Sequence, residues 1–325
     1  MDRSPVTCYN WFMIKHLLLS ACILSCNVSL ASGDDSRRLK VFLLAGQSNM
    51  EGQAVVDLDH PEHYNGGRGI LATVLEDPEV AAEFGHWRDG DGAWIKRDDA
   101  FVCYQPERGP LKTGPLSIGY AGYEGRHHFG PELEIGWQLA EHFDEPVLLI
   151  KTCWGGKSLM KDFRPPSSGG EVGPYYTRMI EEYRAAIASI EAHFPQLAGL
   201  EPELAGFIWF QGWNDMFTDG AIEAYAENLA NLVRDLRKEL EVPDLPFVVG
   251  QTGNADNPEL WAAQEAPTLR PEFKSRSRYV STRAFLRKPE DSPNKGHGHH
   301  WFGNAESYLR AGKGMGVAMV ELQAD

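Results

Sequence analysis

Residues 41–50 read Val41-Phe42-Leu43-Leu44-Ala45-Gly46-Gln47-Ser48-Asn49-Met50, an apolar run that ends in a glycine, with a serine two positions further on. A short apolar run of this kind is typical of a fully buried strand, although periodicity alone does not distinguish it from a buried helix. Gly46 ends the run. Open α/β sheets bind ligands beyond the carboxyl ends of their strands, so Ser48 is predicted to lie at such an edge, near a helix N-terminus that favours anions. On its own, Ser48 is explained more simply as a turn or helix-capping residue, and its role depends on partners elsewhere in the chain.

The rest of the chain alternates between short apolar runs and amphipathic segments. Segments with apolar residues every three or four positions predict helices, and the intervening apolar runs predict strands. Because strands that alternate with helices form parallel βαβ units, we predict one α/β/α domain over residues 39–322, with a parallel sheet of about five strands covered by helices on both faces. The predicted strands after the first are 146–151, 204–210, 246–250 and 278–281. The predicted helices are 130–143, 174–193, 222–240 and 304–322, the last weakened by Gly312, Gly314 and Gly316.

Residues 52–129 form a long insertion that is rich in glycine, aspartate and aromatic side chains. An irregular stretch of this length inside a compact domain is usually functional, and we predict that it forms a wall over the carboxyl edge of the sheet. Residues 94–104 are predicted to hold a strand pair with its turn at 97–99. The aromatic side chains have two interpretations that the sequence leaves open: they face sugar rings, or they fill a satellite core under the insertion.

Residues 1–31 have the pattern of a secretory signal peptide. Residues 17–24 form its short apolar core, and residues 29–31 (Ser-Leu-Ala) supply small side chains for cleavage. The apolar core is too short to span a membrane comfortably. We therefore predict a secreted or periplasmic protein. Met13 is an alternative start, and a lipid anchor at Cys26 is the less favoured alternative.

The composition narrows the class of partner. The chain has 325 residues, of which 42% are hydrophobic, and a formal net charge of −15. The hydrophobic fraction supports a large core, and the acidic balance disfavours nucleic acid and anionic membranes as partners. Three of the five cysteines lie in the leader. The remaining Cys103 and Cys153 either pair in an exported protein or stay as two buried hydrophobic residues.

Three of the predicted strands end in unusual polar loops, which a parallel sheet brings to one edge. The loops are 46–50 (Gly-Gln-Ser-Asn-Met), 154–156 (Trp-Gly-Gly) and 211–215 (Gln-Gly-Trp-Asn-Asp). Together they offer a hydroxyl, glycine N–H groups and a carboxamide, which suit attack on a carbonyl and stabilisation of the resulting oxyanion. Because a serine hydroxyl needs a neighbouring base, we expect that base from the three histidines of segment 295–301.

These groups predict a serine esterase mechanism. His300 takes the proton of Ser48, which attacks an ester carbonyl. The oxyanion is held by the Ser48 N–H group, the Gly155/Gly156 loop and the Asn214 side chain. His300 then protonates the leaving alcohol, and water repeats the cycle.

The three loops, followed late in the chain by a histidine before Trp301, resemble the motifs of the SGNH hydrolase superfamily. Within it, the chain is most similar to sialate O-acetylesterase-like proteins and to the acetylxylan esterases of carbohydrate esterase family 6. The resemblance covers residues 39–322 and implies a flavodoxin-like three-layer fold. It also implies Ser48 as nucleophile, glycine and Asn214 as oxyanion donors, and the late histidine as base. The implied substrates are acetyl esters of carbohydrates, and no metal or organic cofactor is expected.

One departure from the pattern of this superfamily affects the base and its acid. Members usually carry an aspartate three residues before the catalytic histidine, but that position is His297 for His300 and Gly296 for His299. We prefer His300 as the base because it abuts Trp301, as in the family's late motif, and His299 and His297 are the alternatives. The acid remains open. The candidates are, in order, Asp215, Asp291 and Glu132, and a Ser–His dyad helped by a backbone carbonyl is the further possibility.

The remaining predictions concern the rim of the site and other functions. The predicted substrate rim is Gln47, Gln211, Trp154, Trp213 and Trp301. A metal site at residues 297–300, with or without His127-His128, is not predicted, because the spacing matches no established zinc pattern. Two other functions stay open: a non-catalytic carbohydrate-binding relative that has lost its acid, and an arylesterase or lipase-type SGNH hydrolase.

Overall fold

A computed structural model describes residues 38–324, which fold around one seven-stranded sheet. The predicted signal peptide, the alternative start and the lipid-anchor alternative lie outside these residues. The strand order is β4-β3-β6-β1-β7-β8-β9, and every neighbouring pair is parallel except β3 and β4. The strands are β1 (Arg38–Gly46), β3 (Ala100–Tyr104), β4 (Lys112–Pro115), β6 (Val147–Cys153), β7 (Glu201–Phe210), β8 (Phe247–Gly250) and β9 (Ser277–Val280).

All five predicted strands are present, as β1 and β6 to β9, but the prediction of about five strands was two short. The additional strands β3 and β4 come from the insertion and form one edge of the sheet. The predicted strand pair within residues 94–104 is wrong. The hairpin joins β3 to β4 through residues 105–111, whereas Trp94 makes only an isolated bridge with Arg88.

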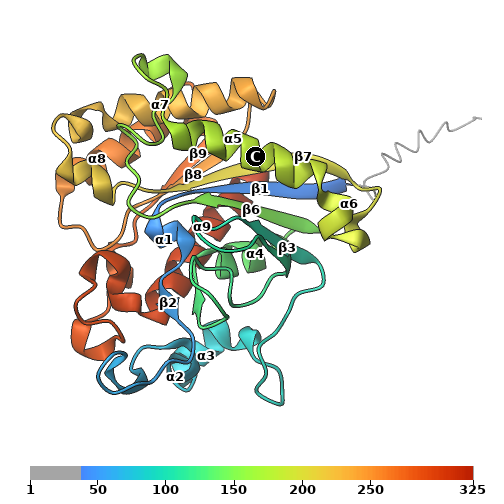
Figure 1. Ribbon diagram of the computed structural model, residues 1–325, viewed down its shortest axis with the longest axis vertical. Coiled ribbons are helices and arrows are strands. Elements are labelled where there is room, and N and C mark those ends of the chain that lie inside the picture. The colour runs from blue at the N-terminus through green and yellow to red at the C-terminus, as the bar shows by residue number, and fades with distance from the viewer. Residues whose placement is uncertain (1–37, 325) are drawn as a thin grey trace, which may run out of the picture. The chain divides into compact units, whose positions relative to one another are not determined.

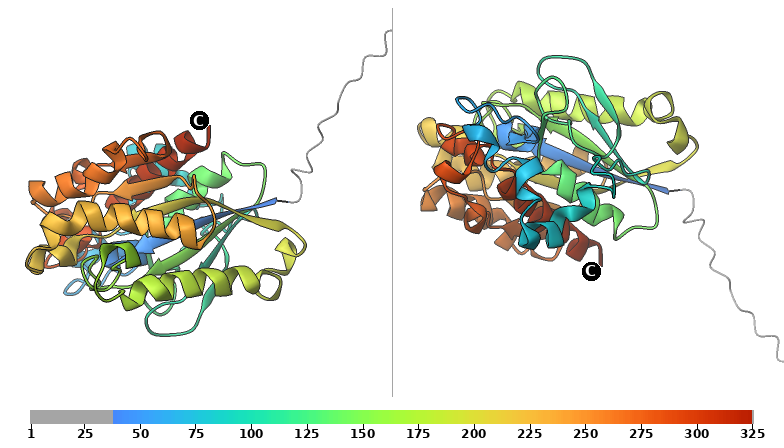
Figure 2. Two further views of the ribbon diagram at one scale, coloured as in Figure 1. Left: turned by 90° about the horizontal axis from the view of Figure 1, so that it is seen from above. Right: turned by 90° about the horizontal axis from the view of Figure 1, so that it is seen from below.

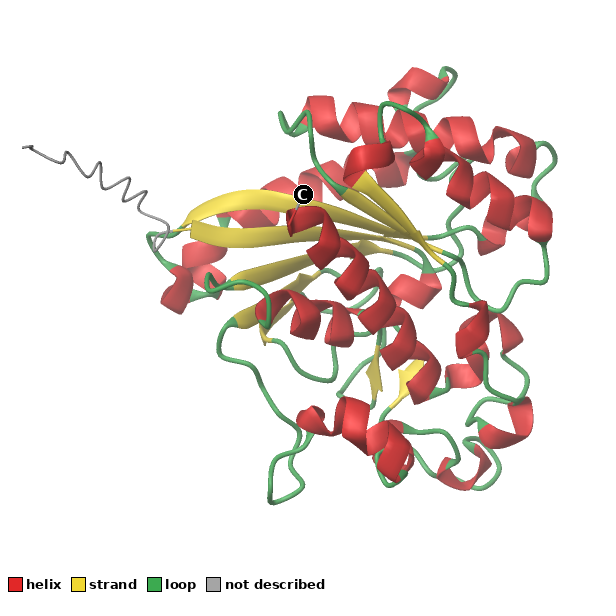
Figure 3. Cartoon of the chain, turned by 180° about the vertical axis from the view of Figure 1, so that it is seen from behind, coloured by secondary structure: helices red, strands yellow, loops and turns green. Residues whose placement is uncertain are grey.

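Helices cover both faces of the sheet, as predicted (Figure 1). One layer contains α5 (Pro174–Ala188), α6 (Ile190–His193), α7 (Ala221–Glu239) and α8 (Pro258–Glu265), and the other contains α4 (Glu132–Ala140) and α9 (Ala305–Ala324). The view from behind in Figure 3 shows the sheet between these two layers, and the view from above in Figure 2 looks onto α5 and α7 with the strands behind them. The predicted helix over 174–193 is divided at Ser189, whose hydroxyl bonds back to the Ala185 carbonyl oxygen at 2.7 Å.

β1 lies in the middle of the sheet because its side chains are apolar on both faces. Phe42 and Leu44 pack into the core on the α4/α9 side, and Val41 and Leu43 pack into the core on the α5/α7 side. All four side chains are completely buried. The continuous apolar run that opens the sequence is thus the signature of a strand covered on both faces.

The glycines of α9 permit close helix packing and do not break the helix. A methyl group at Gly312 would lie 2.5 Å from the Pro131 carbonyl oxygen, and one at Gly316 would lie 2.8 Å from Cβ of Gln138. Glycine inside a helix costs about 1 kcal/mol relative to alanine. Here the close approach of α4 offsets that cost, so the sequence expectation of a weakened helix does not hold.

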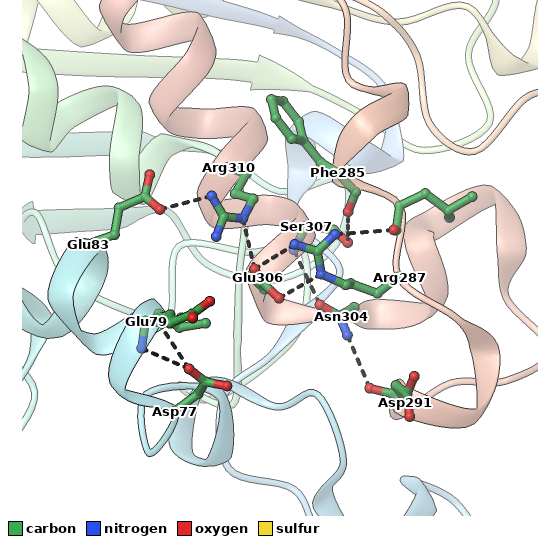
Figure 4. Close-up of polar contacts among 12 residues, drawn as sticks. Asp77, Glu79, Glu83, Phe285, Arg287, Asp291, Asn304, Glu306, Ser307 and Arg310 are labelled. Carbon is green, nitrogen blue, oxygen red and sulfur yellow. Dashed lines mark hydrogen bonds and ion pairs between the residues drawn. The ribbon is translucent and has the colours of Figure 1, made fainter.

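The insertion packs against α9 through its own short elements. These are β2 (Ala54–Val55), α2 (Leu71–Val74), α3 (Pro78–Phe84) and β5 (His128–Phe129), with β2 and β5 paired antiparallel. Figure 4 shows Glu83 of α3 paired with Arg310 of α9, and Arg310 and Arg287 sharing Glu306.

Most aromatic side chains of the insertion belong to the core. Trp87, Phe101 and Tyr104 are fully buried, and Tyr123 is the clearest exception.

The two cysteines outside the leader are free and buried. Cys103 packs into the core on the α5/α7 side of the sheet, whereas Cys153 packs into the core on the α4/α9 side. The sheet separates the two thiols, so the pairing alternative is wrong. Within residues 38–324, no helix combines the length and the apolar character needed to cross a bilayer.

Candidate active site

Ser48 is the first residue of the short helix α1 (Ser48–Glu51), which follows β1 directly. The turn is tight because a Cβ at Gly46 would lie only 2.1 Å from the Phe210 carbonyl oxygen, so only glycine fits there. The Ser48 side chain is partly exposed, and its Oγ lies 2.9 Å from Nε2 of His300. The two residues are 252 positions apart in the chain. The predicted hydroxyl and the preferred imidazole are thus brought together.

His300 reaches Ser48 from a 3₁₀ segment, Gly298–Gly303, that precedes α9. The next two residues, Trp301 and Phe302, have φ angles of 44° and 56°, in the left-handed region that bulky side chains rarely adopt. Such strain persists only where surrounding contacts enforce it. Trp301 is completely buried and stacks on Phe210, with ring centroids 5.5 Å apart. The packing of this tryptophan therefore fixes the backbone that presents His300.

Asn49 links the nucleophile helix to the histidine segment. Its Nδ2 donates to the His299 carbonyl oxygen at 3.1 Å, and its Oδ1 accepts from the Tyr308 hydroxyl at 2.6 Å. Asn49 is fully buried, so both hydrogen bonds are made away from water and their loss would be costly. Asn49 was not predicted to have a role of its own, and the only signal in the sequence is its position directly after the candidate nucleophile.

The imidazole of His300 is held in its neutral form. Burial, together with the neighbouring His299 and His297, lowers the pKa of His300 to about 3. The His299 and His300 ring centroids are 4.0 Å apart, whereas those of His297 and His300 are 6.2 Å apart. Acceptance of the Ser48 proton by Nε2 requires the tautomer with a proton on Nδ1. His300 thus meets the geometric requirement for a general base.

None of the three predicted acids serves His300. The Asp215 carboxylate accepts from the backbone N–H groups of Leu159 and Met160, both at 2.9 Å, and from Nε2 of Gln211 at 2.7 Å. These bonds occupy both of its oxygens and brace the 159–160 backbone against the loop after β7. The structure therefore contradicts the predicted pairing of Asp215 with His300.

The two alternative acids are engaged elsewhere. Glu132 is fully buried, pairs with Nζ of Lys151 at 2.8 Å and accepts from the Gly130 N–H group. Asp291 is exposed. Its backbone carbonyl oxygen, and not its carboxylate, accepts a hydrogen bond from Asn304, as Figure 4 shows. Among residues 38–324, no carboxylate hydrogen-bonds to His300, which leaves a Ser48–His300 dyad.

Gln47 orients the candidate oxyanion donor Asn214. Its Oε1 accepts from the backbone N–H groups of Gly212 at 3.2 Å and Asn214 at 3.4 Å, so its Nε2 must point the other way. That Nε2 donates to Oδ1 of Asn214 at 2.9 Å. Since Oδ1 is thus occupied, the Asn214 side chain presents its Nδ2 donor to a ligand. The arrangement suits stabilisation of developing negative charge.

The two predicted glycine donors differ in their surroundings. The Gly155 amide donates to the Glu51 carboxylate, so this N–H group is already engaged. Gly156 is exposed and left-handed, with φ of 73°, and nothing lies within 4 Å of the place a side chain would take. The Ser48 N–H group, at the start of α1, makes no hydrogen bond to any other residue of the described chain. Ser48 and Asn214 are therefore the better-placed donors.

Four of the five predicted rim residues are not on the rim. Gln47, Gln211, Trp154 and Trp301 are buried, at 1% exposure or less, so they support the site from within. Trp213 is partly exposed, and its ring lies 5.4 Å from the ring of His299.

Phe217 extends the aromatic surface that Trp213 begins. Phe217 was not predicted from the sequence. The two belong to the same 3₁₀ segment, Trp213–Phe217, and their ring centroids are 6.0 Å apart. Phe217 is 72% exposed. An exposed aromatic side chain in a short loop leaves no periodic signal in the sequence, and only its position beside the site gives it meaning.

The described residues include no group of three or more His, Cys, Asp or Glu side chains placed to hold a metal ion. The rings of the three histidines at 297–300 lie beside one another, and that of His299 also lies beside the ring of Trp213. His127 instead bonds to Asp57 at 2.6 Å.

A hydroxyl–imidazole pair at the carboxyl edge of a mostly parallel α/β/α sheet is suited to attack on an ester carbonyl. It fits the SGNH-type fold whose motifs the sequence resembles. Residues 94–321 match the family described as carbohydrate esterase, sialic acid-specific acetylesterase. The chain belongs to this family and is a carboxylic ester hydrolase of the carbohydrate acetylesterase type.

Individual relatives agree with this assignment. The chain is 25% identical over 231 residues to a probable carbohydrate esterase of Arabidopsis thaliana, covering 68% of this chain and 74% of that protein. An X-ray structure of an Arabidopsis thaliana protein superposes with a TM-score of 0.54 at 15% identity, covering 87% of this chain and 98% of that one. The crystal structure of NanS gives a TM-score of 0.51 at 16% identity, covering 89% and 97%. The two structural likenesses show the fold.

Proposed function

We propose that this protein removes O-acetyl groups from an acetylated carbohydrate, with Ser48 as nucleophile and His300 as general base. The observation that carries the proposal is the 2.9 Å contact between Ser48 Oγ and His300 Nε2, in a member of a carbohydrate acetylesterase family. A neutral imidazole in contact with a serine hydroxyl is the arrangement that activates an otherwise weak nucleophile.

The proposed cycle has two halves. His300 Nε2 takes the Ser48 proton as Oγ attacks the acetyl carbonyl, and the resulting oxyanion is held by the Ser48 N–H group and the Asn214 side chain. His300 then gives the proton to the departing sugar hydroxyl, which leaves an acetyl group on Ser48. In the second half, His300 takes a proton from water, the hydroxide attacks the acetyl carbon, and acetate leaves as Ser48 regains its proton.

Release of acetate from a panel of natural substrates tests this proposal. The panel comprises acetylated xylan, acetylated pectin, acetylated sulfated glycans and O-acetylated sialic acids, with p-nitrophenyl acetate as a non-sugar ester. We expect turnover of at least one glycan with kcat/KM above that of p-nitrophenyl acetate. Binding of an acetylated oligosaccharide without turnover would instead support the non-catalytic relative. Turnover of p-nitrophenyl acetate alone would support an arylesterase.

The exposed aromatic side chains beside the site favour a carbohydrate over a small aryl ester. The rings run from His299 through Trp213 to Phe217, and such exposed apolar surface commonly marks a binding site. A sugar ring next to the acetylated one has room to stack there.

We expect Phe217→Ala to raise KM for an acetylated oligosaccharide about 3- to 10-fold relative to KM for p-nitrophenyl acetate, the size of one aromatic contact. Steady-state kinetics on both substrates measure this ratio. Leu269→Ala removes another side chain that is mostly exposed, at 62%, and serves as the matched control. An unchanged ratio would argue against glycan stacking on this surface.

Because no carboxylate among the described residues hydrogen-bonds to His300, we expect an unusual dependence of kcat/KM on pH. The neutral form of His300 is the active one, so kcat/KM falls as pH drops through the pKa of His300. Since that pKa is lowered to about 3, we expect the acid limb of wild type to lie well below the value of 6.5 for an ordinary histidine. Placing a carboxylate at position 297 with His297→Asp should move this limb to higher pH by about one unit or more.

Profiles of kcat/KM between pH 3 and pH 8 measure both effects, with circular dichroism to show where each protein stays folded. His193→Asp, on the exposed end of α6, controls for the change in net charge. A wild-type limb near pH 6.5, or the same limb in His297→Asp, would contradict this account of the base.

We also propose that residues 1–31 direct export and are removed. Support comes from their short apolar core and small-residue end. N-terminal sequencing of protein recovered outside the cytoplasm should begin at residue 32. Recovery of an uncleaved, cell-retained chain would overturn this proposal.

A further inference from the structure

Glu51 is a partly buried carboxylate close to the nucleophile, and the proposed cycle does not use it. It is the last residue of α1, three positions after Ser48. Burial raises its pKa above the ordinary value, while hydrogen bonds from the Tyr104 hydroxyl and the Gly155 amide act in the opposite direction. The distance from the Tyr104 hydroxyl to Oε1 is 3.2 Å. Within residues 38–324, Glu51 belongs to no direct ion pair, although the charge of Lys151 also lowers its pKa. A carboxylate withdrawn from water without a direct ionic partner is costly.

Charge balance does not explain Glu51. The cation that acts on Glu51 is Lys151, whose Nζ donates to the backbone carbonyl oxygen of Glu51 at 3.0 Å and pairs with the Glu132 carboxylate at 2.8 Å. Lys151 therefore already has a buried anionic partner. A glutamate that adds an unpaired negative charge to this region weakens the fold unless it serves another purpose.

The Glu51 carboxylate lies next to the reacting serine, and two glycines flank it. A methyl group at Gly155 would lie 2.9 Å from Oε2 of Glu51 and 3.6 Å from Cβ of Ser48. One at Gly122 would lie 3.1 Å from Oε1. Since neither glycine has a side chain to cover it, the carboxylate stays partly open on the side of the nucleophile. Its two oxygens offer about four acceptor positions, of which Tyr104 and Gly155 use two.

We propose that Glu51 recognises the sugar by accepting a hydrogen bond from a free hydroxyl group next to the acetylated position. This inference rests on the proposed function and deepens it by naming the chemical feature that is read. An ionised carboxylate only accepts hydrogen bonds, so it selects a donor. A sugar ester carries such a donor on the adjacent carbon, whereas an aryl or simple alkyl acetate does not. Glu51 thereby favours partially acetylated sugars over non-sugar esters.

Three substrates separate recognition of the hydroxyl from other roles of Glu51. They are a mono-acetylated methyl glycoside of the sugar that wild type prefers, its deoxy analogue lacking the neighbouring hydroxyl, and p-nitrophenyl acetate. We expect Glu51→Gln to lower kcat/KM for the glycoside about 10- to 100-fold relative to p-nitrophenyl acetate, the range for a hydrogen bond to a charged group. With wild type, the deoxy analogue should show a similar loss, and Glu51→Gln should add little to it.

Controls distinguish this inference from the proposed function. Glu191→Gln removes an exposed carboxylate on α6 and should leave the ratio of the two rates unchanged. Should Glu51→Gln not fold, Glu51→Asp keeps the charge but withdraws the carboxylate by one methylene, and we expect the same selective loss. Equal losses on all three substrates would show that Glu51 only positions the Gly155 loop, and no loss would show that it does not meet substrate. Either result overturns this inference alone, whereas hydrolysis by Ser48→Ala at the wild-type rate would overturn the proposed function.

Discussion

Replacing Ser48 with alanine is expected to lower kcat for acetyl-ester hydrolysis by about 10⁴- to 10⁶-fold, as loss of the nucleophile does in serine hydrolases. Without Oγ no acetyl-enzyme forms, and only the donors around the oxyanion remain to assist water. The fold should be unaffected, because the Ser48 side chain is partly exposed and its hydroxyl bonds, among residues 38–324, only to His300. Initial rates of acetate release, with thermal unfolding of the same preparations, measure both quantities.

A matched serine variant makes this result interpretable. Ser167→Ala removes a hydroxyl that lies away from the site and bonds to Asp235, and it should retain the wild-type rate. If Ser48→Ala hydrolyses the substrate as fast as wild type while remaining folded, Ser48 is not the nucleophile.

Replacing His300 is expected to have the second-largest effect, about 10²- to 10⁴-fold in kcat, which is the usual contribution of a general acid–base residue. The side chain accepts the Ser48 proton at Nε2, and no carboxylate among the described residues takes over that role. His300→Ala leaves a space the size of an imidazole ring beside Ser48. We therefore expect added imidazole to restore part of the activity.

Rescue by imidazole separates a base from a residue that only fills space. The measurement uses a sugar acetate, because imidazole attacks p-nitrophenyl acetate directly. The double variant Ser48→Ala/His300→Ala should show no rescue. If His299→Ala instead loses activity to the same extent and His300→Ala does not, the alternative base is the correct one.

The sequence was sufficient for the central strands and for the meeting of Ser48 with His300. β1 can be recognised in the sequence because it is apolar on both faces. Ser48 and His300 can be expected to meet because a parallel sheet brings the carboxyl ends of its strands to one edge, whatever their separation in the chain. β4, with the sequence Lys-Thr-Gly-Pro, could not be predicted. It carries no apolar run and is a strand only because β3 lies beside it.

The directions of the side chains were the main feature of the site that could not be predicted from the sequence. Asp215 follows a strand at the correct edge, yet its carboxylate turns inward to three donors. Gln47 and Gln211 belong to the motif loops and Trp301 follows the late histidine, yet all three side chains are buried. Such orientations depend on buried hydrogen-bond partners far away in the chain, which residue types and spacing do not specify. Glu51 was passed over for the same reason.

Labelling with a fluorophosphonate, followed by peptide mass spectrometry, tests the central claim most directly, because this reagent reacts with a serine that an adjacent base has activated. We expect one adduct in the wild-type protein, on the peptide that contains Ser48. It should form far more slowly in His300→Ala and be absent from Ser48→Ala. An adduct on another residue, or an unlabelled Ser48 in a preparation that still releases acetate, would contradict it.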